Sequence, residues 1–331
     1  MITYWSVLLA LSVLIYVLLD GLDLGVGMLF GATTDEDRRR AMLASIAPIW
    51  DGNETWLVVA GVLLWGAFPL VYATLLPAFY LPVCIMLAGL IFRGVSFEFR
   101  IHARSSRVVW DLGLILGSLV ATFMQGAMVG ALAQGIPVEN GRFVGSVMTW
   151  LTPFSALSGV ALCFGYMLLG AGWLAKKCEG DVRTAAFVAL PRLLIVVLVL
   201  LAALFFHALH QDFQDFQVMG RWLDRPVLFV VPLAGAFASL CVWRGARGKS
   251  ERYVFSGAAA LFVVGYAMFA ISFWPYIVPF AITINDAAAP MSSLWFMFWG
   301  AGLFVFPLML LYTFSSYRIF KGKVDVSSEH Y

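Results

Sequence analysis

Charged residues are scarce in this chain: they make up 12% of its 331 residues, whereas hydrophobic residues make up 62%. A soluble globular domain carries roughly 25% charged residues. So few charges cannot cover a water-soluble particle, and the composition therefore excludes a cytoplasmic enzyme, a nucleic-acid binder and a secreted disulfide scaffold. The chain is expected to lie in a membrane, and its formal net charge of +2 at pH 7 indicates no particular partner.

Cysteine and histidine are also scarce. The four cysteines are far apart and form no CxxC or Cys/His spacing, so we expect them to be packing residues and expect no metal site. A haem-bearing helix bundle needs axial ligands at matched depths. His102 and His330 are expected in a loop and in the tail, and His207 and His210 near the outer end of one span. The chain is therefore expected to ligate neither haem nor metal.

Long apolar runs fill most of the sequence, and about 20 mostly apolar residues cross a bilayer. The first run has no preceding Lys or Arg and is too long for a signal peptide. The sequence thus predicts an all-α integral membrane protein, with residues 1–331 as a single membrane domain of nine spans. The predicted spans are 4–30, 53–75, 77–99, 110–134, 150–175, 187–209, 227–244, 253–275 and 293–318.

Basic residues gather in alternate connections between these spans. All of the 21 Lys and Arg residues lie on one side except Arg142, Arg221 and Arg225. Cytoplasmic loops carry an excess of Lys and Arg. The pattern predicts that the N-terminus is periplasmic and that the C-terminus is cytoplasmic.

Two acids interrupt the first predicted span. Asp20 and Asp23 stand at i and i+3, and therefore on one helical face. An acid inside a span costs several kcal/mol and indicates a functional site. The glycines of this segment keep the helix thin, which permits close helix approach or a thread of water; they are Gly21, Gly25 and Gly27.

The next two predicted spans carry matching charges. Asp51 and Glu54 open the second span, again at i and i+3, and Trp50 precedes them. Arg93 in the third span is expected at a depth comparable to that of Asp20. Three consecutive helices are thus expected to place four carboxylates and one guanidinium at a similar depth near the cytoplasmic side.

Three interpretations of these charges stay open. Asp51 with Glu54 is typical of a helix N-cap with its capping-box partner. Asp20 and Asp23 could be neutralised by Arg93 and only hold helices together. In the third interpretation the clustered carboxylates, with one compensating arginine, form a hydrated proton uptake route.

Other polar groups are expected at the surface. Glu98 and Asp111 lie close to the cytoplasmic boundary and are predicted to be surface groups. The apolar, Pro-interrupted connection at 276–292 is expected to lie against a partner or the membrane interface. Asp286, within it, is expected to be exposed or to cap a helix.

Three stretches resemble subunit II of the cytochrome bd family of quinol oxidases. They are DGLDLGVGML at 20–29, SIAPIWDGNETWL at 45–57 and IFRGVSFEFR at 91–100. The compact length and the WDGNETW form are most similar to the cyanide-insensitive branch of that family. The resemblance runs over the whole chain and is strongest in its first hundred residues.

The resemblance implies two four-helix bundles plus one peripheral helix, in a multi-pass protein of the bacterial inner membrane. It implies a haem-bearing partner, subunit I, that holds the quinol site and haem b with haem d, or b-type haem alone. The complex would oxidise quinol in the aerobic respiratory chain and reduce dioxygen to water with cytoplasmic protons. The chain is expected to contact membrane lipid and no nucleic acid, while a small single-span accessory subunit and a quinone bound within this chain are left open.

The resemblance also carries residue roles onto this sequence. Asp51 matches the family's acid at the mouth of the subunit II proton channel, and Trp50 stands beside it. Asp20 and Asp23 match the DGxDxG acids of the first span. Glu54 stands where other branches place an amide, and it is the fourth acid of the predicted proton pathway.

Arg93 matches a family arginine, and we infer that it serves as the counter-ion. A proton-coupled secondary transporter is the alternative hypothesis, because it too places acids within helices. Transporters typically show inverted repeats and helices broken at the midplane, and no repeat is visible here. A third hypothesis is an inert assembly scaffold.

Overall fold

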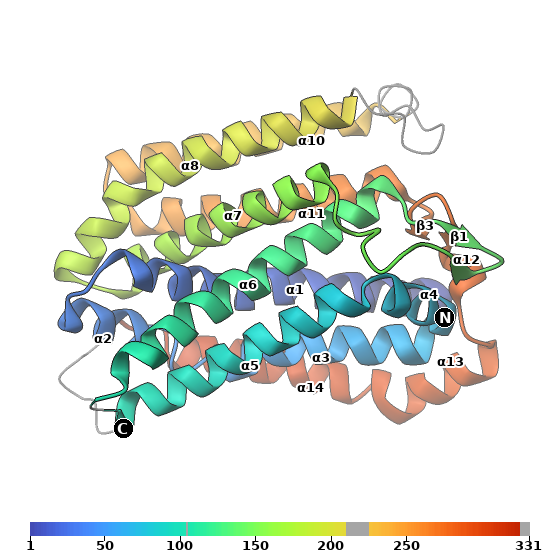
Figure 1. Cartoon of the computed structure of the whole chain (residues 1–331), viewed down its shortest axis with the longest axis horizontal. Helices are drawn as coiled ribbons and strands as arrows, with labels where there is room; N and C mark the ends of the chain where they lie inside the picture. The colour runs from blue at the N-terminus through green and yellow to red at the C-terminus, as the bar shows by residue number, and fades with distance from the viewer. Residues whose placement is uncertain (104, 210–224, 325–331) are drawn as a thin grey trace.

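The computed structural model describes residues 1–103, 105–209 and 225–324 as an array of long helices that run side by side (Figure 1). In the described part, eight helices are long and apolar enough to cross a membrane, which confirms the predicted all-α membrane class. The helices are α1 (Ile2–Leu29), α2 (Glu36–Ala44), α3 (Trp50–Ala67), α4 (Pro69–Ala78), α5 (Tyr80–His102), α6 (Arg107–Gln134), α7 (Pro153–Lys177), α8 (Gly180–Leu209), α10 (Val227–Arg247), α11 (Glu251–Phe273), α12 (Ile284–Ala287), α13 (Met291–Met297) and α14 (Val305–Ile319). The strands are β1 (Val138–Glu139), β2 (Arg142–Phe143), β3 (Tyr276–Val278) and β4 (Ile282–Thr283).

The second predicted span is not one continuous helix. α3 ends at Ala67 and α4 begins at Pro69, with Phe68 between them at φ −131° and ψ 59°. Proline disfavours the α-helical conformation at the residue before it, which explains the break. Because α3 opens with polar residues, it is not among the eight apolar helices.

The last predicted span is also interrupted. A π-helical segment, Phe298–Gly302, and a turn separate α13 from α14. Pro307 offers no N–H to a helix, and its ring clashes with the carbonyl of the residue four places earlier, Leu303, at the turn. The interruption lies against the start of α1, where the Tyr4 hydroxyl donates to the Gly302 carbonyl at 2.9 Å.

α1 lies at the centre of the array. It packs against α3, α6 and α7, while α5 with α6, α7 with α8, and α10 with α11 form neighbouring pairs. α8 and α10 lie along one edge in Figure 1, and α3 and α14 along the opposite edge. Groups on α1 are therefore shielded by helices on several sides.

The predicted thin segment of α1 is confirmed by its contact with α7. A Cβ atom placed on Gly25 would lie 1.9 Å from the carbonyl oxygen of Tyr166, and one on Gly170 would lie 2.6 Å from the carbonyl carbon of Gly25. The two backbones touch there without any side chain between them. Small residues permit such close helix approach in membrane proteins.

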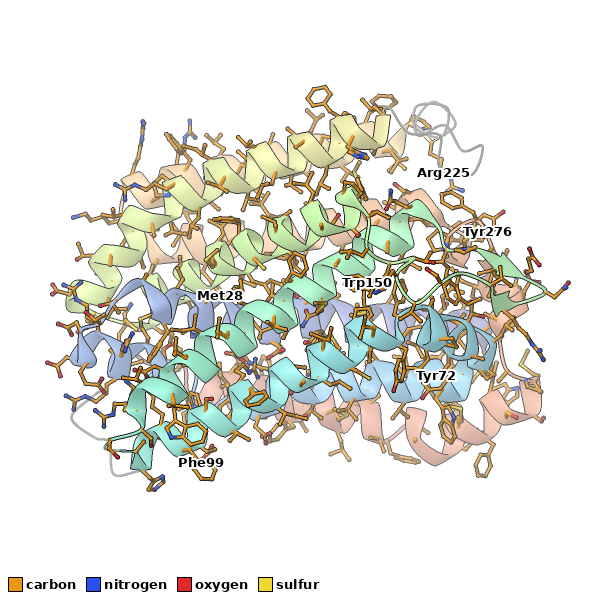
Figure 2. All side chains as sticks on the ribbon, viewed as in Figure 1. Met28, Tyr72, Phe99, Trp150, Arg225 and Tyr276 are labelled. Carbon is orange, nitrogen blue, oxygen red and sulfur yellow. The ribbon has the colours of Figure 1, made fainter. Side chains whose placement is uncertain are left out.

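The array has two polar ends, which differ in the elements that they contain. Side chains in the middle of the helices are mostly carbon, while nitrogen and oxygen atoms gather at the two ends (Figure 2). α2 and the C-terminal end of α14 mark one end, hereafter the α2 end; the N-terminus and the short strands mark the other, hereafter the hairpin end (Figure 1). Basic residues at helix termini of the α2 end are Arg38, Arg39, Arg40, Arg100, Arg107, Lys176, Lys177, Arg183, Arg244, Arg247, Lys249, Arg252, Arg318, Lys321 and Lys323. Residues 104 and 221 lie outside the described residues.

The connection at 276–292 packs on this chain itself. Val278 and Ile282, on the paired strands β3 and β4, are buried in the same core as the start of α1. The apolar side chains of this connection were expected to face a partner or the interface; those two are instead covered by the chain. Asp286 is exposed and belongs to the cap of α12, because its N–H and its carboxylate both contact the Thr283 hydroxyl.

A buried acid cluster between helices α1, α3 and α5

Asp20 and Arg93 form a buried ion pair. Both side chains are almost completely enclosed, with 0% and 4% of their surface exposed, and Arg93 Nη1 donates to Asp20 Oδ1 at 2.6 Å. Arg93 Nη2 donates to Glu54 Oε2 at 3.1 Å, and 28% of the Glu54 side chain is exposed. One guanidinium therefore bridges a buried carboxylate on α1 and a partly exposed carboxylate on α3, at the common depth that the sequence predicts.

Asp23 is buried beside this pair but uses a different partner. Asn53 Nδ2 donates to Asp23 Oδ2 at 2.7 Å, and Asn53 Oδ1 accepts from the Tyr317 hydroxyl at 3.1 Å. Neither Asn53 nor Tyr317 is identified by the sequence reasoning. Asn53 offers a signal, since it is an amide between two acids at the start of a span, whereas nothing near Tyr317 in the sequence points to this site.

The cluster keeps unused hydrogen-bonding capacity. Asp20 Oδ2 and Asp23 Oδ1 are buried without a hydrogen-bond partner. A cavity of about 10 Å³, a size at the lower limit for one water molecule, adjoins Asp23. It is lined by Asp23, Ile46, Trp50, Arg93, Phe97 and Leu114.

The charges in the cluster do not balance. Three carboxylates, those of Asp20, Asp23 and Glu54, lie near a single guanidinium, that of Arg93. It hydrogen-bonds to Asp20 and Glu54 and interacts with Asp23 only electrostatically. Uncompensated buried charge costs several kcal/mol, and interacting carboxylates titrate as a group. The arrangement therefore favours binding and sharing of protons.

Asp51 lies outside the cluster. Its side chain is exposed, and it interacts electrostatically with Glu54, one turn further along α3. The capping-box interpretation is wrong: Ile49 is the N-cap residue of α3, no side chain caps that end, and Asp51 already lies within the first turn. Trp50 adjoins the cluster, with its ring 5.8 Å from the Arg93 guanidinium and 5.3 Å from the Phe97 ring.

Three hydrogen-bonded neutral side chains adjoin Asp20 on the side of the hairpin end. Tyr166 donates to Gln125 Oε1 at 3.2 Å, and Gln125 Nε2 donates to the Tyr16 hydroxyl at 2.8 Å. Tyr16 is one turn before Asp20 on α1 and interacts with it. The sequence reasoning misses this series of hydrogen bonds because Tyr16, Gln125 and Tyr166 lie on three different helices.

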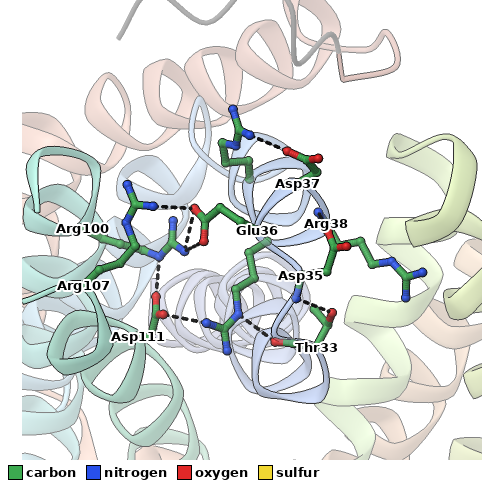
Figure 3. Close-up of polar contacts among 10 residues, drawn as sticks. Thr33, Asp35, Glu36, Asp37, Arg38, Arg100, Arg107 and Asp111 are labelled. Carbon is green, nitrogen blue, oxygen red and sulfur yellow. Dashed lines mark hydrogen bonds and ion pairs between the residues drawn. The ribbon is translucent and has the colours of Figure 1, made fainter. Parts of the chain in front are cut away.

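A second ionic cluster lies at the α2 end (Figure 3). Arg100 Nε donates to Asp111 Oδ1 at 2.5 Å, Arg39 Nη1 donates to Asp111 Oδ2 at 2.6 Å, and Arg100 also contacts Glu36 at 2.9 Å. The prediction that Asp111 is a surface group is wrong, because α2 lies across it and Arg39 and Arg100 enclose it. Glu98 is exposed, as predicted.

The two histidines that the structure describes join neither cluster. His102 is exposed at the last residue of α5, where a loop was expected. Near the end of α8, His207 contacts Phe154 with ring centroids 5.3 Å apart and ring planes tilted by 48°. Residues 210 and 330 lie outside the described part. Among the described residues, no group of three or more His, Cys, Asp or Glu side chains is placed to hold a metal ion.

The fold and the cluster define a class of protein: a multi-pass α-helical membrane protein with acids and a counter-ion buried between its helices. Comparison with known proteins identifies the family. The model of the family "Cytochrome bd terminal oxidase subunit II" matches residues 1–320, and this chain belongs to that family.

Individual relatives agree with this assignment. The chain is 31% identical to cytochrome bd-I ubiquinol oxidase subunit 2 of Escherichia coli (strain K12), over 97% of this chain and 94% of the relative. It is 29% identical to cytochrome bd ubiquinol oxidase subunit 2 of Bacillus subtilis (strain 168), over 97% and 96%. Its fold is similar to a chain of the bd oxidase from Geobacillus thermodenitrificans, with a TM-score of 0.75 at 16% identity, over 96% of this chain and 98% of that one.

Family membership confirms the central functional prediction. The chain is subunit II of a cytochrome bd-type oxidase, part of a quinol-oxidising complex that contains haem and a partner subunit I. It is a multi-pass protein of the bacterial inner membrane. The alternative hypothesis of a secondary transporter is wrong.

Proposed function

We propose that this chain admits protons from the cytoplasm to the oxidase through the acid cluster, and that it ligates no haem itself. The observation that carries the proposal is the Arg93 bridge, which joins the fully buried Asp20 to the partly exposed Glu54. Acids inside a membrane span are costly and mark proton relays. A cluster with more carboxylates than counter-ions binds a proton without leaving a new charge unpaired.

The proposed route begins at the α2 end. Asp51 is the exposed acid at the mouth, and Glu54, one turn deeper, receives the proton from it. The buried acids Asp20 and Asp23 follow. A water molecule in the small cavity beside Asp23 would connect it with the Arg93 side of the cluster.

This direction requires the α2 end to face the cytoplasm. The basic residues at helix termini of that end support this orientation under the positive-inside rule. The proposed topology has nine spans in two four-helix bundles plus one peripheral helix, with the N-terminus periplasmic. α3 is the additional span, because its polar first turn builds the site and its remainder is apolar.

The redox chemistry belongs to the partner. Subunit I is proposed to hold the quinol site and haem b together with haem d, or b-type haem alone. The chain itself is proposed to belong to the cyanide-insensitive branch. Reduction of one dioxygen to two waters consumes four electrons and four protons, and this chain would supply a path for those protons.

The experiment compares Asp51→Asn with Asp286→Asn, an exposed acid at the hairpin end. Quinol-driven oxygen uptake and the reduced-minus-oxidised spectrum are measured on each purified complex. We expect Asp51→Asn to slow turnover several-fold at unchanged haem content, and Asp286→Asn to behave as wild type. Haem loss in proportion to activity would indicate the inert-scaffold hypothesis, and wild-type turnover would refute the route.

A further inference from the structure

We propose that Tyr317 is a positioning residue for Asp23 and acts through the Asn53 amide. The proposal rests on the proposed proton route. It assigns a task to α14, a helix from the other end of the chain. α14 carries no acid of its own among its described residues.

The geometry is a directed hydrogen-bond relay. The Tyr317 hydroxyl donates to Asn53 Oδ1 at 3.1 Å, and Asn53 Nδ2 donates to Asp23 Oδ2 at 2.7 Å. Both Asn53 and Asp23 are buried, with 2% and 1% of their surface exposed. Among the described residues, Asn53 is the one hydrogen-bond donor to the Asp23 carboxylate, since Oδ1 has no partner.

The amide has two orientations with opposite consequences. In the observed one its N–H group faces Asp23 and stabilises the carboxylate. Turned over, its oxygen would face Asp23 and accept from the protonated acid. Asn53 Nδ2 also lies 3.4 Å from the Leu19 carbonyl oxygen, which can only accept, and this contact favours the observed orientation. The Tyr317 hydroxyl completes that orientation by donating to Oδ1, so its removal weakens the orientation in which Asp23 gives up its proton.

Tyr317 is itself held in place by contacts that α7 makes with α14 and with the residues just after it. Its ring contacts Trp173, with centroids 5.9 Å apart, and Trp173 donates to the Ser45 carbonyl at 3.2 Å. Just past α14, the Lys177 ammonium donates to the carbonyls of Phe320 and Gly322. These contacts fix the position of the hydroxyl relative to α3.

Other charged groups also face Asp23. They are Asp20 on α1, Glu54 on α3 and Arg93 on α5, while Tyr317 faces it from α14. Arg93 directs its hydrogen bonds to Asp20 and Glu54. The Asn53 amide is therefore the contact of Asp23 that can be changed from α14 without altering a charge.

The test variant is Tyr317→Phe, which removes the hydroxyl and keeps the ring. Thr313→Val is the matched control: Thr313 lies one turn earlier on α14 and accepts from Trp56 of α3 at 3.2 Å, with no acid involved. Quinol oxidase turnover is measured as a function of pH. The infrared carbonyl band of the protonated acid, identified by its loss in Asp23→Asn, is recorded on the same complexes.

For Tyr317→Phe we expect turnover to fall about three- to tenfold, the range of one hydrogen bond. The alkaline limb of the pH profile should move to higher pH, and the Asp23 band should shift. Thr313→Val should leave both unchanged. Equal effects of the two variants would show that Tyr317 only packs α14 on α3, and an unmoved band and profile would overturn the proposal.

The proposed route fails in a different way. Full turnover in Asp23→Asn would refute the route itself, whatever Tyr317→Phe does. Slow turnover in Asp23→Asn together with wild-type behaviour of Tyr317→Phe would refute the positioning role alone. If Tyr317→Phe lowers haem content, the Asp23 infrared band is read on the complex that remains assembled. A shifted band supports the positioning role, and an unshifted band refutes it.

Discussion

Replacing Gly25 by alanine tests whether contact between the α1 and α7 backbones sets the position of the acids. The new Cβ atom would lie 1.9 Å from the Tyr166 carbonyl oxygen, about 1.5 Å short of ordinary van der Waals contact, and that oxygen belongs to backbone. Because no flexible side chain can give way, the two helices must separate. Overpacking of this kind costs about 1–3 kcal/mol, and the size of the overlap puts Gly25→Ala at the upper end.

The control is Gly61→Ala on α3, where a Cβ atom meets nothing within 4 Å. Alanine is about 1 kcal/mol more favourable than glycine inside a helix, so this control should be neutral or stabilising. Thermal unfolding of the purified complex in one detergent is the assay, with oxygen uptake measured in parallel. Gly25→Ala should lower both the melting temperature and turnover, since a shift of α1 displaces Asp20 and Asp23. Equal melting temperatures for Gly25→Ala and Gly61→Ala would refute the reasoning.

Two further predictions concern the α2 end. Burial raises the pKa of the Cys178 thiol to about 12, so at pH 8 almost no reactive thiolate is present. Mass-spectrometric mapping should therefore find Cys178 unlabelled by maleimide in the native complex and labelled in SDS, and equal labelling would contradict its burial. Arg100→Met should destabilise the complex by about 1.5–3 kcal/mol, because it removes one charged hydrogen bond from the buried Asp111 while Arg39 remains as a partner. The partly exposed Glu36 makes a matched comparison: Glu36→Gln should cost about 1 kcal/mol or less, and equal losses in thermal unfolding would refute the distinction.

The sequence predicts the helices because apolar length and charge alternation are local properties. It predicts the depth at which Asp20, Glu54 and Arg93 meet, since antiparallel neighbours joined by short connections bring matched positions together. It does not predict the break at Phe68 from apolar character alone, because the residues on both sides of the break are apolar.

Contacts between distant segments are the part that the sequence does not predict. Tyr317 meets Asn53 across 264 positions of sequence, and its own neighbours carry no signal of this contact. Asp111 was expected at the surface because the sequence indicates how close it lies to the membrane boundary. The sequence does not indicate that α2 packs over it. The exposed position of Asp51 follows from where α3 begins, which depends on the turn before it.

The most direct test of the central claim is the rate of proton uptake during a single turnover of the reduced complex with oxygen. The uptake is followed with a pH-sensitive dye, for the wild-type complex and for Asp23→Asn at equal haem content. The account predicts uptake slowed on the order of 10²-fold in Asp23→Asn, as expected when a proton-transfer group is removed. Uptake at the wild-type rate in Asp23→Asn would contradict a proton route through the buried acid cluster.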